Sequence, residues 1–305
     1  MDTSPHKSDF VHVNGIKLHY LDWGGEGETL LFLTGMGCSA HLFDRIAPRF
    51  TDQFRVLALT RRGQGESDYP ETGYEADTLI DDILDFLDTL RIDKVILAGH
   101  SMAGLELSHF AVTYPERVIK LIYLDAAFDW REFKVLVENN PLKDIEPPEM
   151  KQEYSSVEDY IAFVKRIRPD LAQIWNESWD QSTLYDLEKN AEGRFVEKDT
   201  KAIGQAMLDT LFAYEPEHRQ IKIPVLSFFS KNDDLPFPDY LTEEQKRKGL
   251  EHHRQVRMPL REQNIKKFQS NVPHAKVIEI PDGHHYCFMA QEEFVYEEMR
   301  KFLLK

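Results

Sequence analysis

The sequence predicts an α/β protein whose central sheet is largely parallel. Several short apolar runs are continuous instead of alternating, which is typical of strands buried on both faces. Segments with helical apolar spacing lie between these runs, as expected when helices connect parallel strands. The predicted strands are TLLFL at 29–33, RVLALT at 55–60, VILA at 95–98, VIKLIYL at 118–124, IPVLSFF at 223–229 and VIEI at 277–280.

The remaining core elements follow from local signals. Residues 10–22 alternate apolar and polar side chains around Asn14-Gly15, the pattern of a two-residue β-hairpin. Helices are expected over 39–50 and over 75–91, where apolar residues of the second segment recur at helical spacing. A final amphipathic helix over 291–304 is expected to turn four apolar residues toward the core: Phe294, Val295, Met299 and Phe302.

The character of the chain changes between residues 128 and 220. Strand signals vanish there, and polar helical stretches such as SVEDYIAFVKRIRP appear. We therefore expect one core, formed by 1–127 and 221–305, that is interrupted by a helical insertion over 128–220. A charged excursion at 236–260 precedes the last strand, and a helix is expected to begin at Glu243. A second lid and an oligomer contact are both open as roles for this excursion.

Composition excludes several classes of partner. The chain has 305 residues, with 37 Lys and Arg against 53 Asp and Glu, so its net charge is −16. Such a charge repels polyanions, and nucleic acid is not expected as a partner. No apolar stretch approaches the ~20 residues of a transmembrane helix, and the N-terminus shows no apolar signal region, so a cytoplasmic protein without a membrane partner is expected. Composition leaves the oligomeric state open.

A short motif between a strand and a helix carries the strongest functional signal. The apolar run 95–98 meets Gly99-His100-Ser101-Met102-Ala103-Gly104, and a segment with helical spacing follows. A serine in this position lies at the apex of a sharp turn, and small neighbours allow the strand and the helix to pass closely. The following helix directs its N-terminal N–H groups toward whatever Ser101 holds.

This motif resembles the nucleophile elbow of the α/β-hydrolase superfamily, and the resemblance covers residues 10–127 and 221–305. It implies an eight-stranded, mostly parallel sheet flanked by helices, with the 128–220 insertion as a helical cap over the active site. It also implies that Ser101 is the nucleophile. The backbone N–H groups of Met36 and Met102 would form the oxyanion hole, although Thr34 stands where the superfamily usually has His.

The resemblance further implies the acid and the base of a catalytic triad. Asp233 follows a strand end where relatives carry the acid, with Asp125 and then Asp234 as alternatives. The Gly-His pattern at 283–284 selects His284 as the base, which leaves His285 as a residue of the pocket wall. The order serine, acid, histidine along the chain is the order that this fold uses.

Aromatic residues of the expected cap are candidates for an apolar substrate pocket. We expect the pocket to be lined by Trp130, Trp175, Trp179 and Phe212, together with His285. Neither a metal nor an organic cofactor is expected, because adjacent histidines such as His284-His285 and His252-His253 rarely aim at one ion. Cys38 and Cys287 are expected to be two free thiols.

These residues predict a serine hydrolase that cleaves a small to medium ester or lactone, of the carboxylesterase type, through an acyl-enzyme. Ser101 at the elbow argues against haloalkane dehalogenases and epoxide hydrolases, which use Asp there, and against dienelactone hydrolases, which use Cys. A carbon–carbon bond hydrolase and an aminopeptidase with the same triad remain as alternatives. A small-molecule receptor on a hydrolase scaffold is the alternative outside enzymes.

Overall fold

A computed structural model describes residues 6–145, 153–232 and 235–305. Its centre is an eight-stranded sheet in the order β1-β2-β4-β3-β5-β6-β9-β10. β1 and β2 pair antiparallel, β2 pairs antiparallel with β4, and every other neighbouring pair is parallel, as predicted. The strands are β1 Lys7–Val13, β2 Ile16–Gly24, β3 Thr29–Leu33, β4 Arg55–Leu59, β5 Val95–His100, β6 Val118–Leu124, β9 Val225–Lys231 and β10 Lys276–Pro281.

The first two strands form the hairpin that the alternation predicted. Val13 pairs with Ile16 across the two-residue turn. Asn14 and Gly15 both have positive φ, 49° and 76°, which matches the right-handed twist of the flanking strands. Asn and Gly tolerate this left-handed conformation better than other residues, so the dipeptide fixes the register of the hairpin.

The parallel strands are buried on both faces, which explains their continuous apolar sequence. On one face, Leu31 and Leu33 of β3 belong to a core formed with α1 (Ala76–Thr89), α2 (Ala103–Thr113) and α9 (Met258–Asn271). On the opposite face, Leu30 and Phe32 belong to a second core. This core includes residues of η1 (Ala40–Phe43), η2 (Ala47–Phe50), α10 (Cys287–Ala290) and α11 (Glu292–Leu303). Each fully buried Leu or Phe contributes about 1.5–3 kcal/mol relative to an exposed one.

Two expectations for the helices of the second face are corrected. The segment 39–50 forms two short 3₁₀ helices instead of one helix. Pro48 lacks the N–H that a continuous helix would bond to residue 44, so the helix breaks there. In α11, Phe294 is 46% exposed, whereas Val295 and Met299 are fully buried. Phe294 precedes Val295 by one residue, a rotation of about 100° around the helix, which turns it away from the core.

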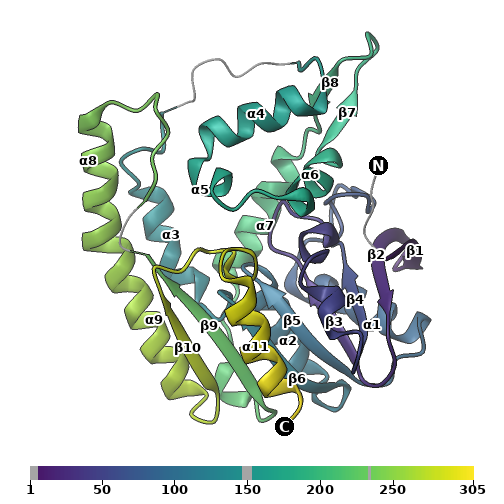
Figure 1. The fold of residues 1–305 in the computed structure, drawn as a ribbon. Helices are drawn as coiled ribbons and strands as arrows, with labels where there is room; N and C mark the ends of the chain where they lie inside the picture. The colour runs from purple at the N-terminus through teal and green to yellow at the C-terminus, as the bar shows by residue number, and fades with distance from the viewer. Residues whose placement is uncertain (1–5, 146–152, 233–234) are drawn as a thin grey trace.

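The segment between β6 and β9 is mostly helical, as expected, but it also contains a short antiparallel pair of strands. Figure 1 shows α4, α5, α6 and this pair gathered over one end of the sheet. Three-residue strands are too short to give a recognisable alternation, so the sequence did not predict them. The elements are α3 Trp130–Glu138, α4 Val157–Ile167, α5 Pro169–Ala172, α6 Glu177–Leu184, β7 Leu187–Lys189, β8 Phe195–Glu197, α7 Lys201–Ala213 and the 3₁₀ turn η4 His218–Gln220. Another 3₁₀ turn, η3 Pro115–Arg117, joins α2 to β6.

The charged excursion before β10 forms a long helical element. α8 (Glu243–His252) begins where a helix was expected. Its N-terminus is stabilised by a capping box, in which the Thr242 hydroxyl accepts from the Gln245 N–H and the Gln245 side chain accepts from the Thr242 N–H. A π-helical turn, η5 (His253–Arg257), joins α8 to α9. Within the described residues, no helix is both long and apolar enough to cross a membrane.

Candidate active site

Ser101 lies in the sharp turn between β5 and α2. Its φ is 55°, a left-handed conformation that is strained for a residue with a side chain. The turn is possible because its neighbours are small. A Cβ at Gly104 would lie 1.9 Å from the Ala126 carbonyl oxygen, and one at Gly99 would lie 2.6 Å from Leu107 Cδ1. The backbone geometry is therefore that of the predicted nucleophile elbow.

Ser101, His285 and Asp125 form a chain of hydrogen bonds. Ser101 Oγ lies 3.0 Å from His285 Nε2, and His285 Nδ1 lies 2.6 Å from Asp125 Oδ2. The carboxylate is completely buried, while the imidazole remains one-third exposed. The carboxylate can only accept, so His285 Nδ1–H donates to Asp125 and leaves Nε2 free to accept from the serine hydroxyl. This is the arrangement of a serine nucleophile, its base and an orienting acid.

His285 occupies the place that the sequence assigned to His284, and this expectation is corrected. His284 turns elsewhere: its Nδ1 accepts the Tyr286 N–H over 3.0 Å, and its ring stacks on the Tyr286 ring. In the turn before it, Asp282 has a φ of 53° and Gly283 N–H donates to Lys231 O. His285 had been assigned to the pocket wall, and it does line the cavity beside Ser101.

Asp125, the second-ranked acid in the sequence, is the carboxylate that contacts His285. Burial opposes its ionisation, but the Arg261 guanidinium and the His285 hydrogen bond together lower the pKa of Asp125 well below its usual range. Its Oδ1 also accepts from Ser230 N–H over 2.9 Å and from Arg261 over 2.6 Å. Asp233 and Asp234 lie outside the described residues.

His100 supports the loop that carries His285. It is buried, and its Nε2 donates to the His285 carbonyl oxygen over 3.1 Å. Its ring also packs on the His285 ring, with centroids 4.5 Å apart. Burial lowers the pKa of His100 well below its usual value, so the ring is neutral at pH 7. A neutral His100 adds no positive charge beside His285.

The loop after β3 passes beside Ser101. A Cβ at Gly35 would lie 3.1 Å from Ser101 Cβ, and both Met36 and Met102 line the cavity that contains Ser101. Arg61 fastens this loop to the elbow helix, because its guanidinium donates to Thr34 O over 2.9 Å and pairs with the buried Glu106 of α2. The predicted oxyanion donors therefore belong to two backbone segments next to the serine.

The cavity over Ser101 has a volume of about 490 Å³. Trp130, Phe212 and His285 line it, as expected. Trp175 and Trp179 do not belong to its wall, and this expectation is corrected. Their rings stack on each other at 5.4 Å, and Trp179 packs edge-on against Tyr286. They belong to the hydrophobic core over the second face of the sheet, because large aromatic residues stabilise cores as often as they line pockets.

Sequence reasoning missed one wall of this cavity. The segment around α8 contributes seven residues: Leu235, Phe237, Gly249, His252, His253, Arg257 and Arg261. Four of them, at 249, 253, 257 and 261, recur every fourth residue and so lie along one face of the helical element. This spacing was visible in the sequence, but only the tertiary structure shows that this face borders Ser101.

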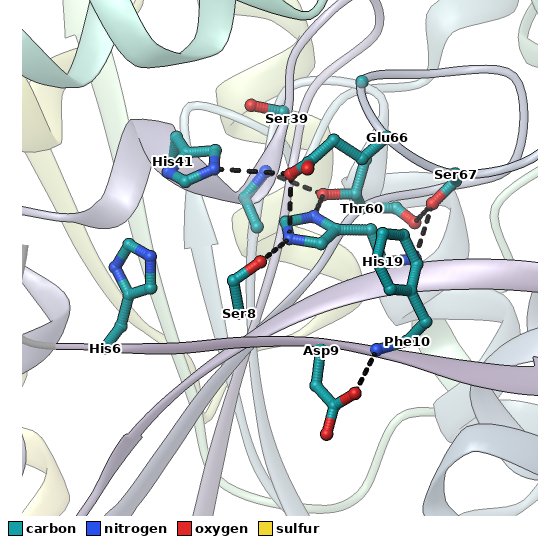
Figure 2. A network of polar contacts seen from close by, with 12 residues as sticks. His6, Ser8, Asp9, Phe10, His19, Ser39, His41, Thr60, Glu66 and Ser67 are labelled. Carbon is teal, nitrogen blue, oxygen red and sulfur yellow. Dashed lines mark hydrogen bonds and ion pairs between the residues drawn. The ribbon is translucent and has the colours of Figure 1, made fainter. Parts of the chain in front are cut away.

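A second cluster of polar residues could hold a metal by residue type and spacing. His19, His41 and Glu66 offer three ligand atoms within 4.8 Å of one another, and so do His6, His41 and Asp44. Figure 2 shows His6, His19, His41 and Glu66 of these side chains; His19 lies within β2, and His6 directly precedes β1. Glu66 Oε2 lies 3.0 Å from His19 Nε2 and 3.6 Å from His41 Nε2, and Asp44 lies 2.9 Å from His41 Nδ1. The cluster joins the loop after β4 to η1.

Glu66 should make folding stability depend on pH in the acid range. Burial opposes its ionisation, but hydrogen bonds with His19 and His41 lower its pKa from 4.5 to about 2. A lowered pKa means that the stabilisation is complete above the unfolded value and is lost as the pH falls from about 4.5 to 2. We expect Glu66→Gln to cost about 2–3 kcal/mol at pH 6 and far less at pH 2.5, measured by urea unfolding. Glu28→Gln, at an exposed position, is the control; equal losses at both pH values would contradict the prediction.

The fold and the Ser101 elbow are those of α/β hydrolases. The family profile described as alpha/beta hydrolase fold matches residues 28–291, and the chain belongs to that family. A 2-(acetamidomethylene)succinate hydrolase of Mesorhizobium japonicum is 28% identical over 208 residues, which are 66% of this chain and 70% of the relative. Epoxide hydrolase 4 of Mus musculus is 38% identical over 115 residues, but the match spans only 37% of this chain and 32% of the relative.

A solved structure shows the same fold over nearly the whole chain. The crystal structure of an E-2-(acetamidomethylene)succinate hydrolase superposes with a TM-score of 0.74 at 21% sequence identity. The superposition covers 98% of this chain and 100% of that protein. The relatives named here are hydrolases, and this agrees with a serine that is hydrogen-bonded through a histidine to a carboxylate.

Proposed function

We propose that the protein is a serine hydrolase of the carboxylesterase type, which cleaves a small to medium ester or lactone. Ser101 is the nucleophile, His285 the general base and Asp125 the acid that orients it. One observation carries the proposal: the hydrogen-bond chain from Ser101 through His285 to Asp125 opens on a cavity of about 490 Å³. This volume lies within the range of small-molecule sites.

Acylation begins when Ser101 Oγ attacks the carbonyl carbon of the ester. His285 Nε2 takes the hydroxyl proton as the new C–O bond forms, and the carbonyl oxygen becomes an oxyanion. The backbone N–H groups of Met36 and Met102 stabilise this oxyanion. The tetrahedral intermediate then expels the alkoxide, which receives the proton from His285, and the acyl group stays on Ser101. In a lactone the leaving alcohol remains attached to the acyl group.

Deacylation repeats these steps with water as the nucleophile. His285 takes a proton from water, whose oxygen bonds to the acyl carbon, and the resulting intermediate expels Ser101 Oγ. The serine regains its proton from His285, and the product acid leaves. Asp125 stays ionised throughout, because its lowered pKa favours the carboxylate, and it stabilises the imidazolium that forms twice per turnover.

We further propose that 128–220 is a cap on a core formed by 1–127 and 221–305. Residues of α3 and α7 support this assignment, since Trp130, Phe133, Leu211 and Phe212 contribute apolar wall to the cavity over Ser101. An apolar wall strengthens the hydrogen bonds of the triad by excluding water. The short match to epoxide hydrolases does not extend the proposal to epoxides, since the elbow residue is Ser101.

The proposed triad has Asp125 as its acid, whereas Asp233 was the acid expected from the sequence. We expect Asp125→Asn to lower kcat for 4-nitrophenyl esters by about 10⁴-fold, because Asn would favour the wrong tautomer of His285. Asp233→Asn, the matched change at the other candidate, should lower kcat by less than about tenfold. Initial rates at pH 7.5 on acetyl to octanoyl esters measure both effects.

Loss of Asp125 could also unfold the domain, because Arg261 would lose its buried partner. Circular dichroism and urea unfolding of each variant therefore accompany the kinetics. A folded Asp125→Asn protein with wild-type kcat would contradict the assignment of the acid. The reverse ranking of the two variants would return the acid to Asp233.

A further inference from the structure

The cavity over Ser101 is positively charged in an otherwise acidic protein. The net charge of the chain is −16. Three of the residues that line the cavity are nevertheless cationic, namely Lys143, Arg257 and Arg261, and the described lining includes no Asp or Glu. A cavity wall that carries charges of one sign within apolar surroundings strengthens the local electrostatic potential, and this potential favours ligands of the opposite charge.

Arg261 does not supply a free positive charge, because it forms an ion pair with Asp125 of the proposed triad. Its Nη2 lies 2.6 Å from Asp125 Oδ1 and 2.6 Å from Ser230 O. Its side chain is only 8% exposed, and the guanidinium also packs over the Phe128 ring. Its charge is compensated by Asp125, so a ligand would gain little from it.

Arg257 differs from Arg261 in having no such partner among the described residues. Throughout the described parts of the chain, its guanidinium has no hydrogen bond or ion pair. The two described carboxylates that act electrostatically on Arg257 are engaged elsewhere, since Asp125 pairs with Arg261 and Asp170 accepts from Arg168 over 2.7 and 3.0 Å. Arg257 lies among many protein atoms, yet its side chain is accessible because it borders the cavity.

The surroundings of Arg257 penalise its charge. Burial and the neighbouring Arg261 both lower the pKa of Arg257, and the two nearby carboxylates only partly offset them. A guanidinium that faces a cavity and has no partner among the described residues is available to an anion that arrives with a ligand. The free protein thus holds a guanidinium in a site that an anionic ligand would complete.

Arg257 lies in the same cavity as Ser101, so an anionic group that binds to it would belong to the molecule whose bond is cleaved. Arg257 borders the large cavity together with Ser101 and His285, and it also borders a smaller cavity of about 110 Å³ that includes His284 and Asp170. It is the last residue of the π-helical turn between α8 and α9. Single π-turns of this kind occur frequently at functional sites.

We propose that Arg257 binds a carboxylate of the substrate, so that the enzyme prefers acyl groups that end in a carboxylate over neutral acyl groups of equal length. This inference rests on the proposed serine hydrolase. A carboxylate fits better than a phosphate dianion, because one guanidinium without a hydrogen-bonded partner among the described residues matches one negative charge and binds it through two parallel hydrogen bonds. The apolar wall at Trp130 and Phe133 would hold the chain between the carboxylate and the ester.

A matched pair of substrates tests the preference. Mono(4-nitrophenyl) adipate and 4-nitrophenyl hexanoate have six-carbon acyl groups that end in a carboxylate and in a methyl group, respectively. We expect the wild-type kcat/KM to be at least tenfold higher for the adipate ester after subtraction of the spontaneous rate. Arg257→Met should reduce the ratio of the two kcat/KM values at least tenfold, and Arg257→Lys should keep part of it, since a charged hydrogen bond contributes roughly this much.

Two control variants separate Arg257 from charge in general. Arg247→Met removes a cation from the exposed face of α8, where Arg247 pairs with Glu244 and Glu251, and should leave the ratio as in wild type. Lys143→Met removes another cation of the same cavity. A ratio that falls with Lys143→Met and not with Arg257→Met would overturn the proposal, as would a wild-type ratio near one.

Binding without turnover keeps the proposal separate from the proposed function. In a Ser101→Ala background, calorimetry would compare 5-phenylpentanoate with 5-phenylpentanamide. We expect the carboxylate to bind at least tenfold more tightly and Arg257→Met to remove the difference. Equal affinities would overturn the proposal even if neutral esters are hydrolysed. A strong preference for the carboxylate without turnover of either ester would support Arg257 and contradict the hydrolase.

Discussion

Ser101→Ala is expected to lower kcat for 4-nitrophenyl esters by about 10⁵- to 10⁶-fold, because the members of a triad act as a unit. Without Oγ, no acyl-enzyme can form, and only direct attack by water would remain. The rate that is left would come from the oxyanion hole and from binding. Initial rates of the wild type and the variant on one ester series measure the effect.

The covalent step can be tested on the same two proteins. A fluorophosphonate should add its mass to the wild type at Ser101 and leave Ser101→Ala unmodified, as judged by mass spectrometry of the intact protein and of its peptides. Ala has the same Cβ as Ser and therefore keeps the strain at φ 55°, so urea unfolding should show a change of at most about 1 kcal/mol. Wild-type kcat in a folded Ser101→Ala protein would contradict the nucleophile assignment.

His285→Ala should have an effect of similar size, about 10⁵-fold or more on kcat, because a serine hydroxyl without a base is a poor nucleophile at pH 7. His284→Ala is the matched control on the adjacent residue. It removes a ring that contacts the backbone of Tyr286 and leaves both triad hydrogen bonds in place, so kcat should fall by less than about tenfold.

The comparison of the two histidines has a clear opposing outcome. If His284→Ala abolished turnover while His285→Ala retained it, the ring that contacts Ser101 during catalysis would be His284. Added imidazole offers an independent check, since it should restore part of the activity of folded His285→Ala and none of that of Ser101→Ala. Rescue limited to His284→Ala would likewise contradict the assignment of His285.

Much of the fold was predictable because the signals are local. Continuous apolar runs identified the parallel strands, since burial on both faces leaves no polar positions, and Asn14-Gly15 identified the hairpin through its tolerance of positive φ. The two corrections in helices have equally local causes: Pro48 breaks the segment 39–50, and Phe294 lies one residue off the buried stripe. The short strands β7 and β8 lack a signal because three residues cannot show a period.

The candidate pocket was less predictable, because an aromatic side chain looks the same in a core and in a wall. Trp130 and Phe212 line the cavity, while Trp175 and Trp179 pack against the core. The wall from α8 to Arg261 was missed for the opposite reason. Its charged sequence indicates an exposed helix, and no local pattern shows that Arg257 borders the cavity beside Ser101.

The sequence by itself determined where the elbow lies, because Gly99-His100-Ser101 and the small residues after it stand between a strand pattern and a helix pattern, the context in which this motif forms a sharp turn. The partners of Ser101 were decided by the tertiary structure. Gly283-His284-His285 offers two adjacent histidines, and only the folded loop shows that the second one lies 3.0 Å from Ser101 Oγ. Asp125, at the carboxyl end of β6, lies beside His285. This contact joins two distant parts of the chain across the sheet, so no local sequence pattern encodes it.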